Sequence, residues 1–320
     1  MRHLLIAASG VFACLSPAQD LRRGLQDATA VLVGRQIGKT AHDEHVVLHR
    51  IQVVVDVRGA AEHRLVTVLD WPQLALHQRP TPRQSRLFCL QDATATAARL
   101  GLPAGDGPYF KLVGWAGSHP LVGADHDADP TLRFARLLAA SEAGAPPTDT
   151  ATGLVGMALG ADPAIRLEAT RLLTERGDLR SKLGEPTWNQ LLARATGEIE
   201  DVPYKIALAE LCAEQRLDGV FDTLLVSLGQ VTDADYARTV GRIGRVLHGE
   251  EVTVRIDARL RQAGQAADRQ TLLLALGASN TQSALDALLR LDAKDAAVEA
   301  ALREHRSPRA RDAVASKRAK

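Results

Sequence analysis

The sequence predicts an α+β protein of two domains, in which a small N-terminal β-barrel is followed by an all-α array of helices. Three observations lead to this prediction. Apolar and polar residues alternate in short runs between residues 28 and 117, as they do in half-buried strands. From residue 131 onward the apolar residues recur at the spacing of amphipathic helices. The length of 320 residues corresponds to two domains of about 150 residues each.

The composition limits the classes of function that the chain can serve. Lys and Arg number 39 against 38 Asp and Glu, so the net charge is +1, and a protein that holds nucleic acid by its overall charge is not expected. Apolar residues make up 46% of the chain, which is enough to bury a core. Aromatic residues make up only 3%, which disfavours a site built on base stacking. We therefore expect no nucleic-acid partner.

Residues 1–18 have the layout of a secretory signal peptide. A short basic start precedes an apolar run from Leu4 to Leu15. Ser16 and Ala18 then occupy the two small-residue positions of a cleavage site after Ala18. The order of basic, apolar and small residues favours export over the alternative, a buried N-terminal helix or strand.

A second processing site overlaps this segment. The run Val11-Phe12-Ala13-Cys14 resembles a bacterial lipobox, which would place a lipid anchor on Cys14. Phe12 stands where that motif prefers a small or β-branched residue, so lipidation is the second interpretation. No later segment approaches the roughly 18 uninterrupted apolar residues of a membrane helix, and we expect no membrane span in the mature chain.

Short segments of the N-terminal half have the alternation of β-strands. In the longest, Val47, His49 and Ile51 lie on one face, while Leu48 and Arg50 lie on the other. A closed barrel suits several short strands, because closure removes the exposed edges. The expected strands are residues 30–37, 45–57, 63–70, 86–90 and 109–115, with a short helix at 92–100 before the last strand.

This region resembles the netrin-like version of the OB barrel, which also occurs in tissue inhibitors of proteases. The resemblance is carried by "VLVGRQI" in the first strand, a long second strand that ends in the turn Arg58-Gly59, and the later runs "VTVLD" and "LFCL". The animal members contain several disulfides that this chain lacks, and inhibition rests partly on an N-terminal cysteine. Cleavage after Ala18 would leave no such cysteine, so the resemblance implies the fold and not the inhibition.

The C-terminal half is predicted to consist of helices joined by short connections. Ala and Leu, which lead the helix-propensity ranking, number 52 and 46. Gly, Asp, Pro or Asn stands at most breaks in the pattern. The expected helices are residues 132–144, 148–160 with Thr148 or Asp149 as its cap, 162–173, 187–198, 203–216, 220–228, 233–247, 252–262, 267–276, 281–291 and 295–305.

Residues 160–173 resemble the second helix of a HEAT repeat. Asp162 is the expected N-cap, and Pro163 takes the first turn, where its missing N–H costs nothing. Similar helices recur in antiparallel succession along the rest of the chain, so the resemblance implies a HEAT-like α-solenoid. An irregular helical bundle is the alternative.

The same helix makes a specific prediction about burial. Ile165, Ala169 and Leu172 share one face and should be buried between neighbouring helices. Arg166 and Glu168 are expected to lie off that face.

The change of period gives the expected division of the chain. The prolines of Ala145-Pro146-Pro147 mark the linker, because proline breaks helices and favours extended backbone. The expected segments are a signal peptide at 1–18, a β-barrel domain at 19–125, a helix and linker at 126–147, a HEAT-like α-solenoid at 148–305 and a basic disordered tail at 306–320.

Two clusters of potential metal ligands were considered. In the run from His42 to His49, His45 and His49 face the same way but are about 13 Å apart on an extended strand, too far for one zinc ion. The alternating aspartates that begin at Asp125 resemble the start of a calcium loop. Pro130 and Arg136 stand where that loop needs glycine and a bidentate acid, so neither metal is expected.

The remaining motifs receive structural interpretations. Cys89 and Cys212 are expected to be buried thiols without a disulfide between them. Residues 79–83 form a proline-containing connection, and residues 105–107 lack the strand–loop–helix setting of a phosphate loop. The basic residues from Arg303 onward could touch anionic lipid or nucleic acid, but a frayed terminus is the more common explanation.

The leading functional hypothesis is a non-catalytic interaction or scaffold protein of the bacterial cell envelope or periplasm. It would bind a protein partner through the solenoid surface, because solenoids offer long binding faces and no closed pocket. Two alternatives stay open: an accessory subunit of an envelope enzyme whose partner supplies the active site, and a structural lipoprotein anchored through Cys14. No catalytic residue, metal or cofactor is expected.

The signal-peptide interpretation predicts the N-terminus of the mature protein. Mass spectrometry of envelope material from the native cell should find a chain that starts at or near Gln19. Full-length protein that starts at Met1 would contradict export by this route, and a lipid on Cys14 would favour the lipoprotein alternative.

Overall fold

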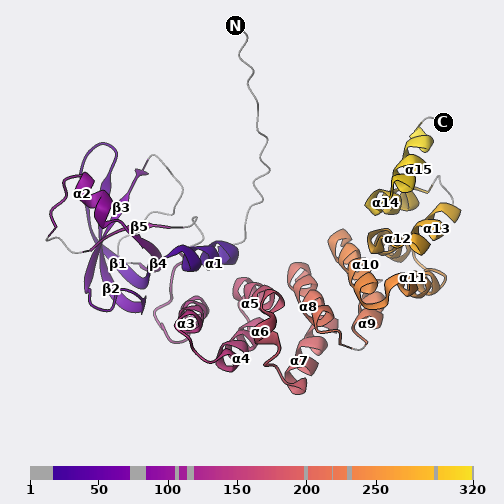
Figure 1. Ribbon diagram of the computed structural model, residues 1–320, viewed down its shortest axis with the longest axis horizontal. Coiled ribbons are helices and arrows are strands. Elements are labelled where there is room, and N and C mark those ends of the chain that lie inside the picture. Colours follow the sequence, from indigo (N-terminus) through magenta and orange to yellow (C-terminus); the bar gives the residue numbers. More distant parts are fainter. Residues whose placement is uncertain are drawn as a thin grey trace, which may run out of the picture. The chain divides into compact units, whose positions relative to one another are not determined.

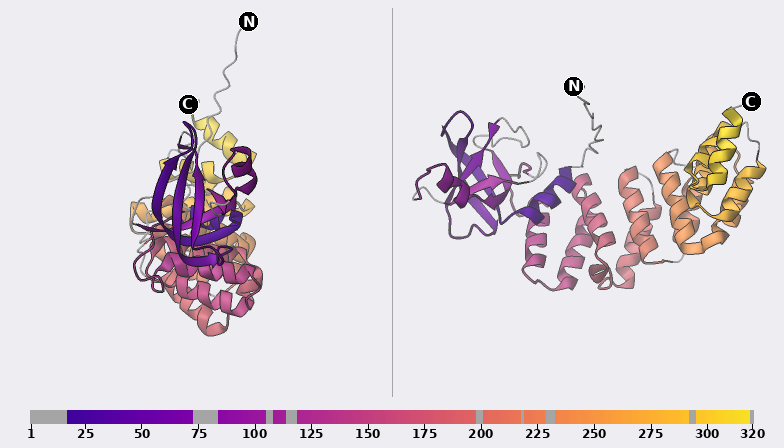
Figure 2. Two further views of the ribbon diagram at one scale, coloured as in Figure 1. Left: turned by 90° about the vertical axis from the view of Figure 1, so that its left-hand side faces the viewer. Right: turned by 45° about the horizontal axis from the view of Figure 1, so that its top comes forward.

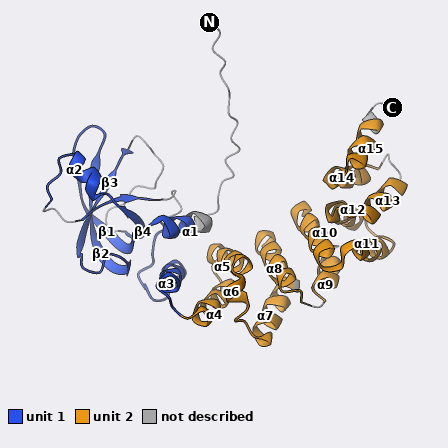
Figure 3. Cartoon of the chain, viewed as in Figure 1, with its two compact units in different colours: residues 1–145 blue, residues 146–320 orange. Residues whose placement is uncertain are grey.

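The computed structural model contains a five-stranded barrel followed by a long series of helices (Figure 1). It describes residues 17–72, 84–104, 108–113, 119–197, 201–217, 219–228, 233–291 and 295–318. The chain divides into two compact units, residues 1–145 and 146–320 (Figure 3). The predicted α+β organisation, with the barrel first and the helices after it, is confirmed.

The strands of the first unit close into a barrel in the order β1-β2-β3-β5-β4. Neighbouring strands are antiparallel except for β3 and β5, which run parallel. Closure pairs β1 with both β2 and β4, so β1 has no free edge. The strands are β1 (Ala30–Ala41), β2 (Val47–Arg58), β3 (Leu65–Asp70), β4 (Ser85–Asp92) and β5 (Tyr109–Leu112), with helix α2 (Thr94–Arg99) between the last two.

The barrel core is formed by the inward faces of all five strands. Leu32, Ile51, Val68, Phe88 and Phe110 are among its buried side chains. The alternation predicted for β2 is present, because His49 and Ile51 are buried while Arg50 and Gln52 are exposed. β1 is longer than predicted and continues past Gly38, where a shift in its register with β2 lets the strand bend without ending.

Helix α1 (Pro17–Asp27) was not predicted, because the sequence analysis gave no structure to the residues after the signal segment. Leu21 and Leu25 are buried, and the helix contacts β4. Arg58 holds the end of the helix, since its guanidinium donates to the carbonyls of Leu25, at 2.5 Å, and Ala28, at 2.6 Å. Arg58 also pairs with Glu142 of α3 (Pro130–Glu142), so one side chain joins α1, β2 and α3.

The turn after β2 depends on a glycine, as the sequence suggested. Gly59 has a φ of +74°, and a Cβ there would lie 2.6 Å from the carbonyl oxygen of Thr29. Both the backbone conformation and the close approach therefore exclude a side chain.

The second unit is helical throughout its described residues. Each predicted helix is present, and the ends differ by a few residues. The helices are α4 (Pro147–Ala158), α5 (Pro163–Glu175), α6 (Gly177–Arg180), α7 (Glu185–Thr196), α8 (Val202–Glu214), α9 (Val220–Ser227), α10 (Ala234–His248), α11 (Val252–Leu260), α12 (Ala266–Ser279), α13 (Gln282–Arg290), α14 (Ala296–Glu304) and α15 (Pro308–Arg318), with the short 3-10 helix η3 (Gly249–Glu251) before α11.

These helices pack in two layers. In the first layer, which we call the inner layer, α5, α8, α10, α12 and α14 contact one another in succession. In the second layer, α4, α7, α9, α11 and α13 each contact the inner helix that follows them in the chain. Figures 1 and 2 show the helices of this unit in chain order, from magenta to yellow.

Helix α5 confirms one part of its burial prediction and corrects the other. Ile165, Ala169 and Leu172 are buried, as expected. Arg166 and Glu168 were expected off the buried face, but only 7% and 1% of their surfaces are exposed. The prediction was wrong because α5 contacts α4, α6 and α8, so that more than one of its faces is covered.

Other helix ends depart from the sequence analysis in identifiable ways. Asp162 caps α5 as predicted, since its carboxylate accepts the Ile165 N–H at 2.9 Å. The cap of α4 is Pro146 and not Thr148 or Asp149, because prolines fit a first turn that needs no N–H donors. Residues 306–320 were expected to form a disordered tail, yet α15 forms there and buries Ala310.

Inner helices α10, α12 and α14 approach so closely that glycine is required at the contacts. A Cβ added to Gly241 of α10 would lie 2.1 Å from the carbonyl oxygen of Ala275 in α12. A Cβ on Gly277 of α12 would lie 2.1 Å from the carbonyl oxygen of Ala301 in α14. Both contacts are with backbone, which cannot rotate away as a side chain can.

Gly241→Ala should therefore destabilise the second unit by about 1–3 kcal/mol, the usual cost of forcing extra volume into a packed contact. Gly156→Ala in α4 is the matched control, because a Cβ there meets nothing within 4 Å. The control should raise stability by about 0.5–1 kcal/mol through helix propensity alone. Urea denaturation followed by circular dichroism measures both, and equal effects of the two substitutions would contradict this packing.

Candidate functional site

One hollow of the helical unit is a groove that crosses α5, α8 and α10, here called the α8–α10 groove. It has a volume of about 280 Å³. Its floor is apolar, with Ala213 and Ile243 buried beneath it, and Val246 stands at its surface with 61% of its area exposed. The remaining lining residues are polar: Thr174, Glu210, Glu214, Thr239 and Arg242.

Charged groups along the groove are held by ion pairs between helices. Arg242 of α10 lies 3.6 Å from Glu210 of α8 and donates a 2.7 Å hydrogen bond to Thr239. Glu214 lies 3.9 Å from Arg180, a long ion pair. The lining thus carries two carboxylates and one guanidinium around an apolar floor. An arrangement of this kind can hold an apolar side chain together with a basic one.

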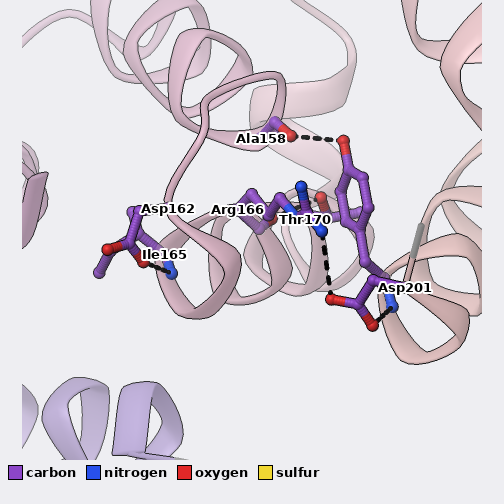
Figure 4. Close-up of polar contacts among 7 residues, drawn as sticks. Ala158, Asp162, Ile165, Arg166, Thr170 and Asp201 are labelled. Atoms are coloured by element: carbon purple, nitrogen blue, oxygen red, sulfur yellow. Dashed lines mark hydrogen bonds and ion pairs between the residues drawn. The ribbon is translucent and has the colours of Figure 1, made fainter.

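A buried polar cluster connects the N-terminal parts of α5 and α8 (Figure 4). The guanidinium of Arg166 lies 3.4 Å from the carboxylate of Asp201 and 4.6 Å from the ring centroid of Tyr204. Tyr204, the unlabelled side chain in the figure, donates a 2.5 Å hydrogen bond to the carbonyl of Ala158. Asp201 is also the N-cap of α8. The cluster gives a buried guanidinium an acidic partner and joins two helices, which is a structural role.

The same contact recurs farther along the inner layer. Arg269 of α12 pairs with Asp295, the N-cap of α14. Each arginine stands four residues after the N-cap of its own helix. The N-cap is Asp162 for Arg166 and Gln265 for Arg269. The pairing with Arg269 lowers the pKa of Asp295. These two links, each from an early arginine to the N-cap of the next inner helix, were not predicted from the sequence.

The histidines considered as metal ligands have separate partners. His42 lies 3.1 Å from the carbonyl of Leu100, and His45 pairs with Glu44 at the surface. His49 is buried in the barrel, 3.2 Å from the carboxylate of Asp70. Among the described residues, no three His, Cys, Asp or Glu side chains are grouped as a metal site would require.

The aspartates considered as calcium ligands form hydrogen bonds and an ion pair with groups in and around α3. Asp129 caps the helix, accepting the Leu132 N–H at 2.9 Å, with Pro130 in the first turn. Asp125 accepts the N–H groups of Asp127 and Ala128. Asp127 pairs with Arg136 at 2.9 Å, the residue that replaces the bidentate acid of a calcium loop.

Both cysteines within the described ranges are free and buried. Burial raises the pKa of Cys89 to about 12 and that of Cys212 to about 12, so neither is a reactive thiolate near neutral pH. Cys14, residues 79–83 and residues 105–107 lie outside the described residues. Arg303 and Arg309 of the basic C-terminal region pair with Glu299 and Asp286.

Comparison with known proteins identifies no relative. No family model matches the chain, and no curated protein and no solved structure matches it. Within the described ranges, no helix has both the length and the apolar character needed to cross a membrane.

The residues that line the groove were not predicted from the sequence. The signal that could have indicated them is Val246, an apolar residue that follows buried Ile243 by one helical turn and stands next to Arg245 in the chain, yet is itself exposed. An exposed valine on an arginine-rich face has no role in the packing of α10. The neighbours that turn this face into a groove come from α5 and α8, and their proximity is a tertiary property.

Asp201→Asn tests the polar cluster. Asparagine caps helices as well as aspartate does, so the substitution removes only the charge that faces Arg166. We expect the free energy of unfolding to fall by about 1–2 kcal/mol, because the guanidinium is buried. The control is Asp162→Asn, which alters the cap of α5 and should change stability by less than about 0.5 kcal/mol. Urea titrations compare the two, and equal losses would show that the ion pair contributes nothing.

Proposed function

We propose that this chain is an exported, non-catalytic interaction protein of the bacterial cell envelope, which binds a protein partner in the α8–α10 groove. The observation that carries the proposal is the groove itself, in which exposed Val246 stands over an apolar floor with two carboxylates beside it. The occupant that fits is a peptide segment with an apolar side chain next to a basic one.

We further propose that the second unit is a HEAT-like α-solenoid. Three features support this assignment: the two layers of helices, the Asp-Pro opening of α5, and the repeated contact between an early arginine and the next N-cap. In such an array each repeat contacts mainly its neighbours, so successive inner helices form a continuous face. The α8–α10 groove lies on helices of that face.

For the first unit we propose an OB-like barrel of the netrin-like type. The closed order β1-β2-β3-β5-β4, with β3 parallel to β5, supports this assignment. The glycine turn after β2, on which the resemblance partly rested, also fits it. In this proposal the barrel is a second binding module, and it is not assigned protease inhibition.

The proposal that the protein is non-catalytic rests on the structural contacts that its histidine, cysteine and aspartate side chains make. His49 faces Asp70 inside the barrel, and Cys89 and Cys212 are buried thiols with raised pKa values. Asp129, Asp162 and Asp201 are helix caps. Each of these groups has a structural role where it stands.

Photo-crosslinking in the native envelope tests the partner and the groove together. A photoreactive amino acid at position 246 of the full-length chain should crosslink one defined protein, and the same amino acid at position 254 should not. Val254 of α11 is the matched control, because it is also an exposed valine, on a helix of the other layer.

The crosslinked partner, once purified, allows a quantitative test. Val246→Asp should weaken its binding at least about tenfold, since a charge would replace the apolar contact at the centre of the groove. Val254→Asp should leave binding unchanged, and both variants should fold, because both positions are exposed. Identical crosslinks from the two positions, or full binding by Val246→Asp, would refute the groove as the partner site.

A further inference from the structure

A second hollow in the helical unit lies where the ends of α8 and α10 meet α9 and α11. Its volume is about 320 Å³, at the lower end of the range of small-molecule sites. Its charged and polar lining residues are Arg216, Asp222, His248 and Arg255, and its apolar ones include Leu217, Phe221 and Leu247. It shares no lining residue with the α8–α10 groove.

Arg216 occupies a backbone conformation that favours glycine. It follows the C-cap of α8 with a φ of +54°, and its N–H closes the helix by donating to the carbonyl of Ala213 at 2.9 Å. Glycine adopts this conformation without strain, whereas a residue with a Cβ does not. The guanidinium is exposed and has no hydrogen-bond or ion-pair partner in the described part of the chain. No contact within the described residues explains an arginine at this position.

Two further groups on the wall are held in place. Arg255 of α11 donates a 2.7 Å hydrogen bond to Asp222 of α9, which orients the guanidinium and leaves its other N–H groups available. The imidazole of His248 packs against the ring of Phe221, with 5.1 Å between ring centroids. Burial, and next the charge of Arg255, lower the pKa of His248, while Asp222 and Glu251 act in the opposite direction.

We propose that this hollow binds a small organic phosphate monoester. The phosphate lies between the guanidinium groups of Arg216 and Arg255, and the organic group packs against Leu217 and Phe221. A phosphate dianion fits two guanidinium groups better than a carboxylate ligand would. The phosphate oxygens can accept hydrogen bonds from both guanidinium groups at once. A volume of about 320 Å³ leaves room for an organic group beside the phosphate. The proposal is independent of the partner protein proposed for the groove.

The decisive variant is Arg216→Gly, which separates ligand binding from stability. Glycine relieves the backbone strain, so the melting temperature of the helical unit should rise by about 2–4 °C. Loss of the guanidinium should weaken binding of phenyl phosphate about tenfold or more, as measured by isothermal titration calorimetry on the full chain. A variant that is more stable yet binds less cannot owe the loss of binding to misfolding.

Control ligands and a control variant complete the experiment. Arg290→Gln removes an exposed arginine at the end of α13 and should leave binding unchanged. Inorganic phosphate should bind more weakly than phenyl phosphate, because it lacks the organic group that packs against the apolar residues. Benzyl alcohol should not bind, because the phosphate contributes most of the binding free energy. The proposal is overturned if the wild type shows no saturable binding at millimolar phenyl phosphate. It is equally overturned if Arg216→Gly binds as the wild type does, or if Arg290→Gln weakens binding as much.

Discussion

Close approach between successive inner helices is the constraint on which the second unit depends. At Gly241 and Gly277 the backbone of one helix lies so near the backbone of the next that no Cβ fits. Helix α12 is consequently enclosed, and every residue from Thr271 to Gly277 is buried. Arg238 of α10 reaches Glu304 of α14 at 2.7 Å, from one neighbour of α12 to the other. A helix covered on all sides must be apolar all round, which explains the Leu-Leu-Leu-Ala-Leu run that α12 contains.

Close packing also decides how the polar groups are arranged. Arg166 is buried between inner helices, and Asp201, the N-cap of the next inner helix, lies beside it. One carboxylate thus accepts a hydrogen bond from the N-terminus of a helix and also neutralises a buried cation. In the first unit Arg58 has a comparable role, because it binds the last carbonyls of α1 and pairs with Glu142 of α3. In both units arginine joins elements that lie far apart in the sequence.

The surfaces proposed for binding are the places where packing does not explain the residue. Val246 is exposed although Tyr236, Val240 and Ile243 of α10 are buried, and Arg216 has a Cβ where glycine would end the helix without strain. The two positions lie in different hollows with different chemistry. The groove around Val246 has an apolar floor and an excess of carboxylates, whereas the hollow beside Arg216 carries two guanidinium groups. They are therefore suited to different ligands, a peptide segment and an organic phosphate.

Local pattern was sufficient to predict the strands and most of the helices of this protein. The alternation in residues 45–57 indicated the faces of β2, and Asp162 with Pro163 indicated the start of α5, because strand period and helix capping act over a few residues. It did not predict α1 or α15, whose apolar residues become buried only against other elements.

Tertiary structure alone decided the burial of Arg166 and Glu168, the pairing of Arg58, and both proposed sites. These features arise from helices and strands that are distant in sequence. A periodic pattern shows which face of a helix is apolar, but the number of neighbours that cover the helix depends on how the whole chain packs.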